Sequence, residues 1–290
     1  MGDLQAVLID GQRIDPSTAG LPVLERALHY GDALFETMAC LEGRPRLLER
    51  HLRRLALGCE RLGLEAPAAG LLASELADLA RGTSRSVIKL LLTRGVALAR
   101  GYALAGGERP RRIALRYAWP REDSTAQVEG VRVRLAKLRL GENPALAGIK
   151  HCNRLEQVLA RREWTDPTIA EALLFSSSGA LVSGTMSNVF LVQRSKLLTP
   201  LIDRCGVAGV MRGLVLEIAS ATGISAQERR LDVAELETAE ELFLTNAVNG
   251  IRPVRELAGV SRARGPVTRL LQEGLAAHFA AQVQAGDAGG

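Results

Sequence analysis

The sequence predicts a mixed α/β (α+β) fold in two domains, on three observations. The chain has 290 residues, about twice the usual length of a single domain. Segments with the periodicity of strands and of helices follow one another in both halves, without the regular βαβ repeat of a parallel sheet. A polar, turn-rich stretch, Pro120 followed by REDSTAQ, separates the halves. We therefore expect a small N-terminal domain at 1–119, a linker at 120–127 and a larger domain at 128–290.

The elements of the first half follow from turn chemistry and hydrophobic spacing. Asp10-Gly11 is a strong hairpin signal and predicts a strand on either side of it. The stretch RLLERHLRRLALGCERLGL repeats leucine every three or four residues, which predicts an amphipathic helix. Alternating apolar residues predict further strands. The elements expected in this half are strands at 4–9, 12–14, 87–93 and 113–119 and helices at 46–64 and 71–81.

Helix starts and turns divide the second half in the same way. Asn153 and Glu156 have the spacing of a capping box, which predicts the start of a helix. Ser178-Gly179 predicts a tight turn between two apolar strands. The elements expected here are strands at 131–135, 171–176, 181–192 and 241–247 and helices at 153–164, 212–222 and 265–285.

Composition excludes several classes of protein. Lysine and arginine outnumber aspartate and glutamate by 37 to 32, but the basic residues are spread along the chain and aromatic residues are only 3%. Stacking platforms are therefore scarce, and the basic residues are better explained as a solvated, arginine-rich surface, so we expect no nucleic-acid partner. The chain starts without an apolar signal segment, and its longest uncharged stretch, 172–193, is too polar for a membrane span. Four scattered cysteines without a CxxC pair indicate neither a metal site nor disulfides, so we expect a cytoplasmic protein.

A shortage of lysine narrows the search for chemistry. Only four of the 37 basic residues are lysines, and one of them, Lys150 in AGIKHCNRLEQ, lies between an apolar strand end and a helix start. An amine in apolar surroundings has a lowered pKa and becomes a nucleophile that can form a Schiff base with an aldehyde. On spacing alone, a boundary lysine with its ammonium group in water explains the position better.

Four segments of the chain point beyond that simple explanation: KHCNRLEQVLAR, EALLFSSSGALVSGTMSNVFLV, GVAGVMRG and TNAVNGIRPV, in this order. Together they resemble the fold-type IV pyridoxal-phosphate enzymes. The phrases LGENPALAGIKHCNRLEQVL and RGYALAG are more similar to the family's aminodeoxychorismate lyases than to its branched-chain or D-amino acid aminotransferases. The resemblance runs from about Gly31 to Val254. It implies a two-domain, D-amino acid aminotransferase-like fold and pyridoxal 5'-phosphate as the cofactor.

The resemblance also implies roles for individual residues. Lys150 would hold the cofactor as a Schiff base and carry the proton in the reaction. Arg54, in HLRRL, would contact the cofactor phosphate, whereas its neighbour Arg53 is better explained as a solvated helix residue. Backbone N–H groups at a helix start would also bind the phosphate, because unpaired donors and the helix dipole favour an anion there. The residues implied for this are Val210 and Met211, with Asn246 and Ala247 in a second phosphate loop.

Ser183 departs from the pattern of the family, in which a glutamate at this position contacts the pyridine nitrogen of the cofactor. A serine offers a hydroxyl hydrogen bond but no charge, so the protonated nitrogen is less favoured and the ring becomes a weaker electron sink. Transamination should suffer more than an elimination whose product becomes aromatic. Ser183 therefore argues against an aminotransferase more than against a lyase. The competing interpretation is a slow or degenerate enzyme.

The substrate side of the site is implied by the segment TRGVALARGY. Arg94, Arg100 and Tyr102 match residues that line the substrate-carboxylate side in the family, and arginine forks bind carboxylates bidentately. The family's lyases usually have glycines where this chain has VALA at 96–99, so the chain departs from them in this loop.

A second segment, HYGDALFETM, matches positions that line the active site from the small domain. It supplies Tyr30 and Thr37. Thr37 would position a proton or the leaving enolpyruvate, or is an ordinary threonine of a strand. His29 and His151 are tempting acids, but we interpret His151 as structural because it would point away from the lysine along the chain. We interpret Cys152 as a small buried residue.

These expectations favour one function over two alternatives. The favoured function is a homodimeric lyase that converts 4-amino-4-deoxychorismate to 4-aminobenzoate and pyruvate in folate biosynthesis, the dimer being implied by the family. The first alternative is a fold-type IV aminotransferase for branched-chain or D-amino acids. The second is a non-catalytic homologue, which would leave the retention of Lys150, Arg54 and the phosphate loops unexplained.

Overall fold

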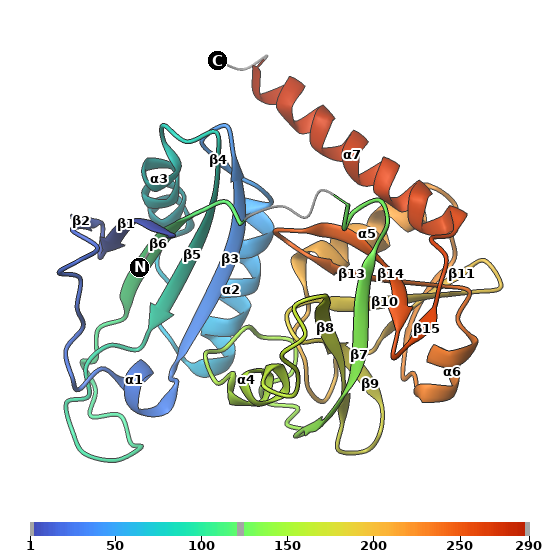
Figure 1. The fold of residues 1–290 in the computed structure, drawn as a ribbon. Helices are drawn as coiled ribbons and strands as arrows, with labels where there is room; N and C mark the ends of the chain where they lie inside the picture. Colours follow the sequence, from blue (N-terminus) through green and yellow to red (C-terminus); the bar gives the residue numbers. More distant parts are fainter. Residues whose placement is uncertain (1–2, 121–124, 288–290) are drawn as a thin grey trace. The chain divides into compact units, whose positions relative to one another are not determined.

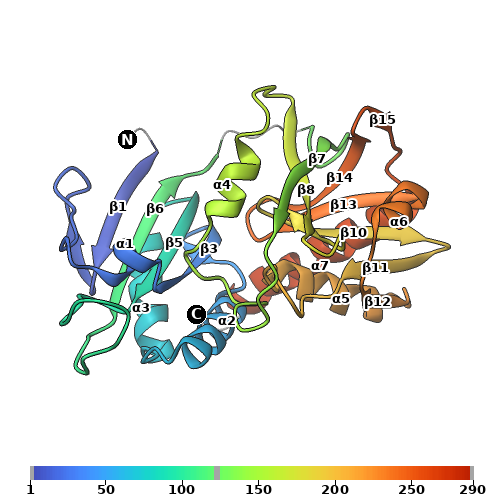
Figure 2. The same cartoon turned by 90° about the horizontal axis from the view of Figure 1, so that it is seen from below.

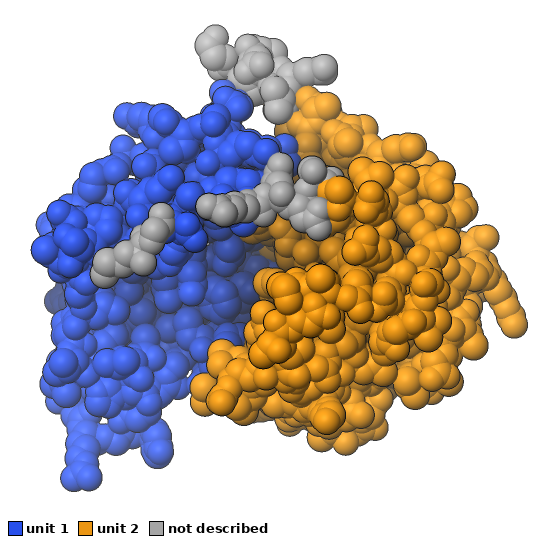
Figure 3. Space-filling model, in the orientation of Figure 1, with its two compact units in different colours: residues 1–122, 149–154 blue, residues 123–148, 155–290 orange. Residues whose placement is uncertain are grey.

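The computed structural model describes residues 3–120 and 125–287, which divide into two units (Figure 1, Figure 3). The first unit comprises Met1–Glu122 with Ile149–Arg154, and the second comprises Asp123–Gly148 with Leu155–Gly290. Both units mix strands and helices, so the predicted mixed α/β class is confirmed. Residues 121–124 of the linker expected at 120–127 lie outside the described residues.

A six-stranded antiparallel sheet, in the order β2-β1-β6-β5-β3-β4, forms the framework of the first unit over its described residues. The hairpin predicted at Asp10-Gly11 is present, with both residues at positive φ. Strand β3 was not among the expected elements, yet it pairs with β5 along its whole length. The strands are β1 (Leu4–Ile9), β2 (Gln12–Ile14), β3 (Ala33–Leu41), β4 (Arg44–Pro45), β5 (Arg85–Thr93) and β6 (Arg111–Ala118).

Helices α2 (Leu48–Leu62) and α3 (Ala69–Ala80) pack against this sheet, and the short α1 (Arg26–Tyr30) precedes β3 (Figure 1). The buried residues of α2 include His51, Leu55 and Gly58, whose spacing places them on one face of the helix. A Cβ at Gly58 would lie only 2.8 Å from Leu34 Cδ1, so the glycine allows α2 to approach β3 closely. This approach brings polar side chains of α2 against the strand.

The second unit is built on a nine-stranded mixed sheet whose main path is β12-β11-β10-β13-β14-β7-β8-β9, with β15 paired to β14. The single strand predicted at 181–192 is wrong, because a turn at 185–187 divides it into two strands. The strands are β7 (Val131–Leu140), β8 (Ile169–Ser176), β9 (Leu181–Gly184), β10 (Asn188–Gln193), β11 (Lys196–Pro200), β12 (Ala226–Arg229), β13 (Glu241–Asn246), β14 (Gly250–Leu257) and β15 (Val260–Ser261).

Helices α5 (Val210–Ala221) and α7 (Pro266–Asp287) pack against each other and against β13 (Figure 2). The helix expected at 153–164 is the shorter α4 (Leu155–Arg161), and its predicted capping box is absent. Asn153 donates instead to the Gly31 carbonyl, and Glu156 accepts from the Gly141 N–H. A capping box does occur at α6 (Val233–Thr238).

The segment around Lys150 belongs to the first unit, which corrects the expectation that the larger domain carries this lysine. The reason is backbone pairing with β3. The Phe35 N–H donates to the Lys150 carbonyl at 2.9 Å, and the Cys152 N–H donates to the Ala33 carbonyl at 2.9 Å. These bonds attach residues 149–154 to the edge of the strand that also carries Thr37.

In the part of the chain that the structure describes, no helix is both long and apolar enough to cross a membrane. No group of three or more histidine, cysteine or acidic side chains there could hold a metal ion.

Candidate active site

Lys150 lies over an aromatic ring in the first unit. Its Nζ is 4.3 Å from the centroid of the Phe35 ring. Burial lowers the pKa of Lys150 to about 8, and the charges of Arg54 and Lys89 act in the same direction, whereas the carboxylate of Glu36 opposes them. A lysine amine with this pKa is available as a nucleophile and base near neutral pH.

A second lysine shares the same ring. Lys89 on β5 is the register partner of Thr37 on β3, and its Nζ is 5.1 Å from the centroid of Phe35. Its charge is one of those that lower the pKa of Lys150. The sequence marks Lys89 only as one of four lysines, because no motif around it signals its proximity to Lys150.

Arg54 is held by a buried carboxylate. Glu36 on β3 is almost fully buried and accepts two hydrogen bonds from the Arg54 guanidinium, one of them from Nε at 2.8 Å. His51, one helical turn before Arg54, meets the same carboxylate through Nδ1 at 2.6 Å. Burial alone would raise the pKa of Glu36, but the bonds and charges of His51 and Arg54 outweigh it and lower that pKa. An ionised Glu36 therefore fixes the orientation of Arg54.

Among the described residues, the other ring nitrogen of His51 has no hydrogen-bond partner. His51 is fully buried, and its Nε2 is unsatisfied. Burial lowers the pKa of His51, and the charges of Arg54 and Lys150 add to this, although Glu36 opposes them. A buried nitrogen without a partner is uncommon in folded proteins and is a group that a bound ligand can satisfy.

The start of α5, in the second unit, offers backbone donors. Gly209 precedes the helix and provides no side-chain cap to its first N–H groups. A Cβ at Gly209 would lie 2.0 Å from Asn188 Oδ1, so only glycine fits there. Asn188 in turn donates to the Val207 carbonyl at 2.9 Å and fixes the loop before the helix. Val210 and Met211 are the first residues of α5, and their side chains are buried.

Asn246 shapes the loop that follows β13. Its Oδ1 accepts hydrogen bonds from the backbone of Val248 at 3.0 Å and of Asn249 at 2.8 Å. The Thr245 hydroxyl closes the loop by donating to the Gly250 carbonyl at 2.9 Å. Ala247 lies inside this loop, between Asn246 and the two N–H groups from which the Asn246 side chain accepts hydrogen bonds.

Ser183 is buried near the end of β9. Its hydroxyl donates to the carbonyl of Gly184 at 2.9 Å, and no carboxylate of the described chain is among its hydrogen-bond partners. The serine is therefore oriented by the turn that follows it.

The match to known proteins covers most of the chain. Residues 33–257 match the family described as amino-transferase class IV. The chain belongs to this family. An aminodeoxychorismate lyase of Vibrio harveyi is 30% identical over 259 residues, which cover 88% of this chain and 95% of that protein. A putative branched-chain-amino-acid aminotransferase of Methanocaldococcus jannaschii is 29% identical over 278 residues, covering 92% and 94%.

Solved structures agree with the fold. The crystal structure of 4-amino-4-deoxychorismate lyase from Pseudomonas aeruginosa matches with a TM-score of 0.88 and 44% identity, covering 93% of this chain and 97% of that one. The branched-chain amino acid aminotransferase of Escherichia coli matches with a TM-score of 0.83 at 24% identity. The predicted fold-type IV architecture is confirmed.

The hydrogen bonds of Arg94 differ from those expected of the substrate-binding residue that the resemblance implies. Its Nε donates to Asp32 at 2.7 Å, and its two terminal nitrogens donate to the carbonyls of Leu62 and Gly63 at 2.6 and 2.8 Å. These carbonyls end helix α2, so the buried guanidinium acts as a helix cap. This geometry favours a structural role over substrate binding in this member of the class IV family.

The other implied substrate residues are more accessible. Arg100 and Tyr102 are exposed, and the Tyr102 ring lies 5.3 Å from that of the half-buried Tyr30. Thr37 is half-buried on β3, one residue from Glu36. In the described part of the first unit, no hydrogen bonds join Arg100, Tyr102, Tyr30 and Thr37 into one cluster that could bind a carboxylate.

The immediate surroundings of His29, His151 and Cys152 explain the contact of the first and the pKa shifts of the other two. His29 contacts the Val23 carbonyl through Nε2 at 2.7 Å. Burial and the charge of Arg154 lower the pKa of His151 to about 4, and burial raises the pKa of the Cys152 thiol. A neutral histidine and a protonated thiol are expected at neutral pH.

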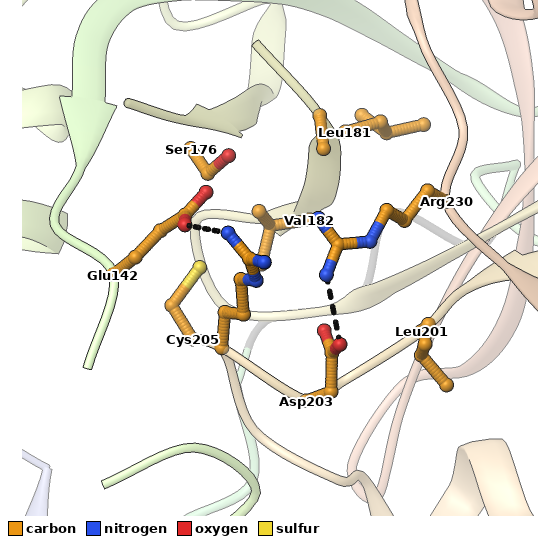
Figure 4. Close-up of a pocket in the computed structure, with 10 residues that line it drawn as sticks. Glu142, Ser176, Leu181, Val182, Leu201, Asp203, Cys205 and Arg230 are labelled. Carbon is orange, nitrogen blue, oxygen red and sulfur yellow. Dashed lines mark hydrogen bonds and ion pairs between the residues drawn. The ribbon is translucent and has the colours of Figure 1, made fainter. Parts of the chain in front are cut away.

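A small pocket in the second unit contains none of the implied site residues (Figure 4). Its charged groups are paired, Glu142 with Arg204 and Asp203 with Arg230, each at 3.0 Å. Burial raises the pKa of its thiol, Cys205, to about 11. Its charged groups and its thiol therefore do not point to this pocket as the reaction site.

Proposed function

We propose that this class IV protein is a pyridoxal-phosphate-dependent lyase that converts 4-amino-4-deoxychorismate to 4-aminobenzoate and pyruvate. The observation that carries the proposal is the amine of Lys150, whose pKa of about 8 suits both attachment to an aldehyde and proton transfer. Similarity to aminodeoxychorismate lyases over almost the whole chain supports this reaction.

The residues in place suit a phosphorylated aldehyde. Lys150 supplies an amine for the aldehyde, and Arg54 supplies a fixed guanidinium for the phosphate. The start of α5 supplies uncapped N–H groups of the kind that bind phosphate. The unpartnered Nε2 of His51 is a further buried group for a ligand to satisfy. We infer that the first unit offers Lys150 and Arg54 to pyridoxal phosphate. The second unit offers phosphate donors at the start of α5, with the contribution from Val210, Met211, Asn246 and Ala247 that the resemblance implies.

The bound cofactor would draw electrons from the amine-bearing carbon of the substrate. Lys150 Nζ accepts the proton of that carbon. At pH 7.5 an amine with a pKa of about 8 is neutral in about one molecule in four, against about one in a thousand for a lysine at 10.5. The bond to the enolpyruvate oxygen then breaks. The released enolpyruvate takes up a proton to give pyruvate, and the remaining ring is aromatic 4-aminobenzoate.

Thr37 and Lys89 face each other across β3 and β5 near this amine. The Thr37 hydroxyl would position the proton that the leaving enolpyruvate takes up. The Lys89 ammonium would bind one of the substrate's two carboxylates. We propose Lys89 for this role because Arg94 donates its hydrogen bonds to Asp32 and to the end of α2. Tyr30, Arg100 and Tyr102 remain proposed substrate contacts.

Ser183 favours elimination over transamination. Its hydroxyl hydrogen-bonds to a carbonyl and provides no negative charge to hold a proton on the pyridine nitrogen. A weaker electron sink slows reactions that must store the electron pair in the ring. Formation of an aromatic product compensates for that loss in the lyase reaction, and nothing compensates for it in an aminotransferase.

An aminotransferase for branched-chain or D-amino acids is the second candidate, favoured by the similarity to the archaeal relative. Ser183 argues against it. A non-catalytic homologue is the third candidate. It would leave the lowered pKa of Lys150 and the ionised carboxylate that fixes Arg54 without a purpose.

Two measurements test the proposal. The protein is incubated with pyridoxal phosphate, reduced with borohydride and digested, and the phosphopyridoxyl group is located by mass spectrometry. We expect it on Lys150 in the parent and in the control Lys196→Ala, whose lysine is exposed, and expect none in Lys150→Ala. Both lysine variants are then incubated with aminodeoxychorismate. Pyruvate from Lys196→Ala but not from Lys150→Ala supports the proposal. Amino-group exchange with a keto acid, without pyruvate release from aminodeoxychorismate, would favour the aminotransferase instead.

We also propose that the protein is a cytoplasmic homodimer. Exposed apolar side chains gather on the segments around α1 and 98–102, which are joined by bonds from Arg26 to the carbonyls of Gly101 and Tyr102. They are Val23, Leu24, Leu28, Leu98 and Tyr102. An apolar surface of this kind is typical of a subunit interface. The four cysteines are free, as a reducing compartment requires. Light scattering on the purified protein should give twice the mass of the chain.

A further inference from the structure

Glu171 is a buried carboxylate for which the proposed reaction has no use. It lies on β8, and its side chain has no exposed surface. Its Oε1 accepts from Arg252 Nη2 at 2.6 Å, and its Oε2 accepts from the Ser187 hydroxyl at 2.8 Å and from the Met186 N–H at 3.1 Å. Burying a carboxylate costs free energy unless its charge is paired and its oxygens are hydrogen-bonded, and here both conditions are met.

The carboxylate holds the turn at 184–187, which joins β9 to β10. The Gly184 N–H closes this turn on the Ser187 carbonyl at 2.8 Å. A Cβ at Gly184 would lie 2.6 Å from Glu171 Oε2 and 2.3 Å from Ser187 Oγ, so the turn is pressed against the carboxylate. The hydroxyl of Ser183 donates to the carbonyl of Gly184. The position of the Ser183 oxygen therefore depends on a turn that Glu171 fixes.

The partner of Glu171 connects the turn to a second loop. Arg252 lies on β14, directly after the loop shaped by Asn246, and it pairs in register with Leu244 of β13. The Asn246 amide also reaches the Met186 carbonyl, at 3.5 Å. One ion pair thus joins the turn that orients Ser183 to the two strands that carry the loop of Asn246 and Ala247.

We propose that Glu171 is a positioning residue that, with Arg252, fixes Ser183 and the Asn246 loop at the separation required to bind the pyridine nitrogen and the phosphate of one cofactor molecule. This inference rests on the proposed function, because only there do both segments contact the same ligand. Arg252 matches the charge of Glu171, so the pair acts through geometry and adds no net charge beside the ring.

The test replaces the pair as a unit. Glu171→Met together with Arg252→Met removes both charges and the links to the turn without leaving an unpaired buried charge. The control replaces a more exposed ion pair of the same unit, Arg132 with Glu256, joined at 2.9 Å, by two methionines. Each protein is titrated with pyridoxal phosphate and with pyridoxal, which lacks the phosphate, and the dissociation constants are compared. The same titrations are repeated with Ser183→Ala added to each background.

We expect the Glu171/Arg252 replacement to weaken pyridoxal phosphate binding by about tenfold or more, the cost of lost buried hydrogen bonds, with a smaller loss for pyridoxal. Ser183→Ala should weaken binding in the parent and in the control but have no further effect in the Glu171/Arg252 background. Unchanged affinity, or an equal effect of Ser183→Ala in every background, would overturn the inference.

Two further results distinguish a failure of this inference from a failure of the proposed function. If the parent protein binds no pyridoxal phosphate at Lys150, the proposed function fails and the inference fails with it. If the parent binds and the paired replacement binds equally well, only the inference fails. Should the paired replacement not fold, Ser187→Ala removes one bond to Glu171 and leaves the ion pair intact. It should weaken binding in the same direction, and unchanged binding would contradict the inference.

Discussion

Replacing Lys150 by methionine should stabilise the protein without cofactor. The pKa of Lys150 falls from 10.5 to about 8 because burial disfavours its charge. That difference corresponds to about 3 kcal/mol of folding free energy. Below pH 8 the lysine is protonated in both the folded and the unfolded chain, and folding carries this full cost. The cost declines between pH 8 and 10.5 and is absent above 10.5, where both states are neutral.

The assay is urea unfolding of the cofactor-free proteins at several pH values. At pH 7 we expect Lys150→Met to raise the unfolding free energy by up to about 3 kcal/mol, and we expect this gain to shrink as the pH rises through 8 towards 10.5. Lys137→Met, at an exposed lysine, is the control and should change stability little at any pH. A Lys150→Met protein that is less stable than the parent at pH 7, or a gain independent of pH, would refute the reasoning.

Four other predictions follow from the geometry. Gly209→Ala would place a Cβ 2.0 Å from Asn188 Oδ1, so the start of α5 must shift and pyridoxal phosphate affinity should fall by on the order of tenfold, whereas Gly213→Ala, where a Cβ meets nothing, should leave it unchanged. Glu36→Gln should weaken binding of pyridoxal phosphate but not of pyridoxal, because it loosens Arg54; equal losses for both ligands would contradict this. Arg94→Ala should lower stability by about 3 kcal/mol with little change in the KM of the folded enzyme, and a large rise in KM would restore Arg94 to the substrate site. Ser183→Glu should raise any transaminase side activity measured with a keto acid, and an unchanged rate would disprove the electron-sink argument.

The sequence was sufficient for features encoded by local patterns. The hairpin at Asp10-Gly11 and the amphipathic helix α2 follow from turn chemistry and leucine spacing, and both are present. The predicted capping box at Asn153 failed because tertiary contacts claimed both side chains. The strand predicted at 181–192 failed because residues 185–187 form a turn, and Glu171, which holds this turn, is distant in the sequence.

The site shows the same division between local and distant signals. Lys150 could be singled out because the motif around it is distinctive, and Arg54 because it lies in HLRRL. The residues that surround Lys150 and Arg54 could not be singled out from the sequence. Glu36 is 15 residues from His51, and Lys89 lies on a different strand from Phe35. The hydrogen bonds of Arg94 could not be predicted either, because an arginine's sequence context does not show whether its guanidinium points inward.

The most direct test of the central claim is the stoichiometry of products from aminodeoxychorismate. Purified protein with pyridoxal phosphate is incubated with this substrate in the absence of any added keto acid, and pyruvate and 4-aminobenzoate are measured over time. A lyase that uses Lys150 as its base releases the two products in equal amounts over many turnovers. Absence of 4-aminobenzoate, with amino-group transfer appearing only when a keto acid is supplied, would contradict the account.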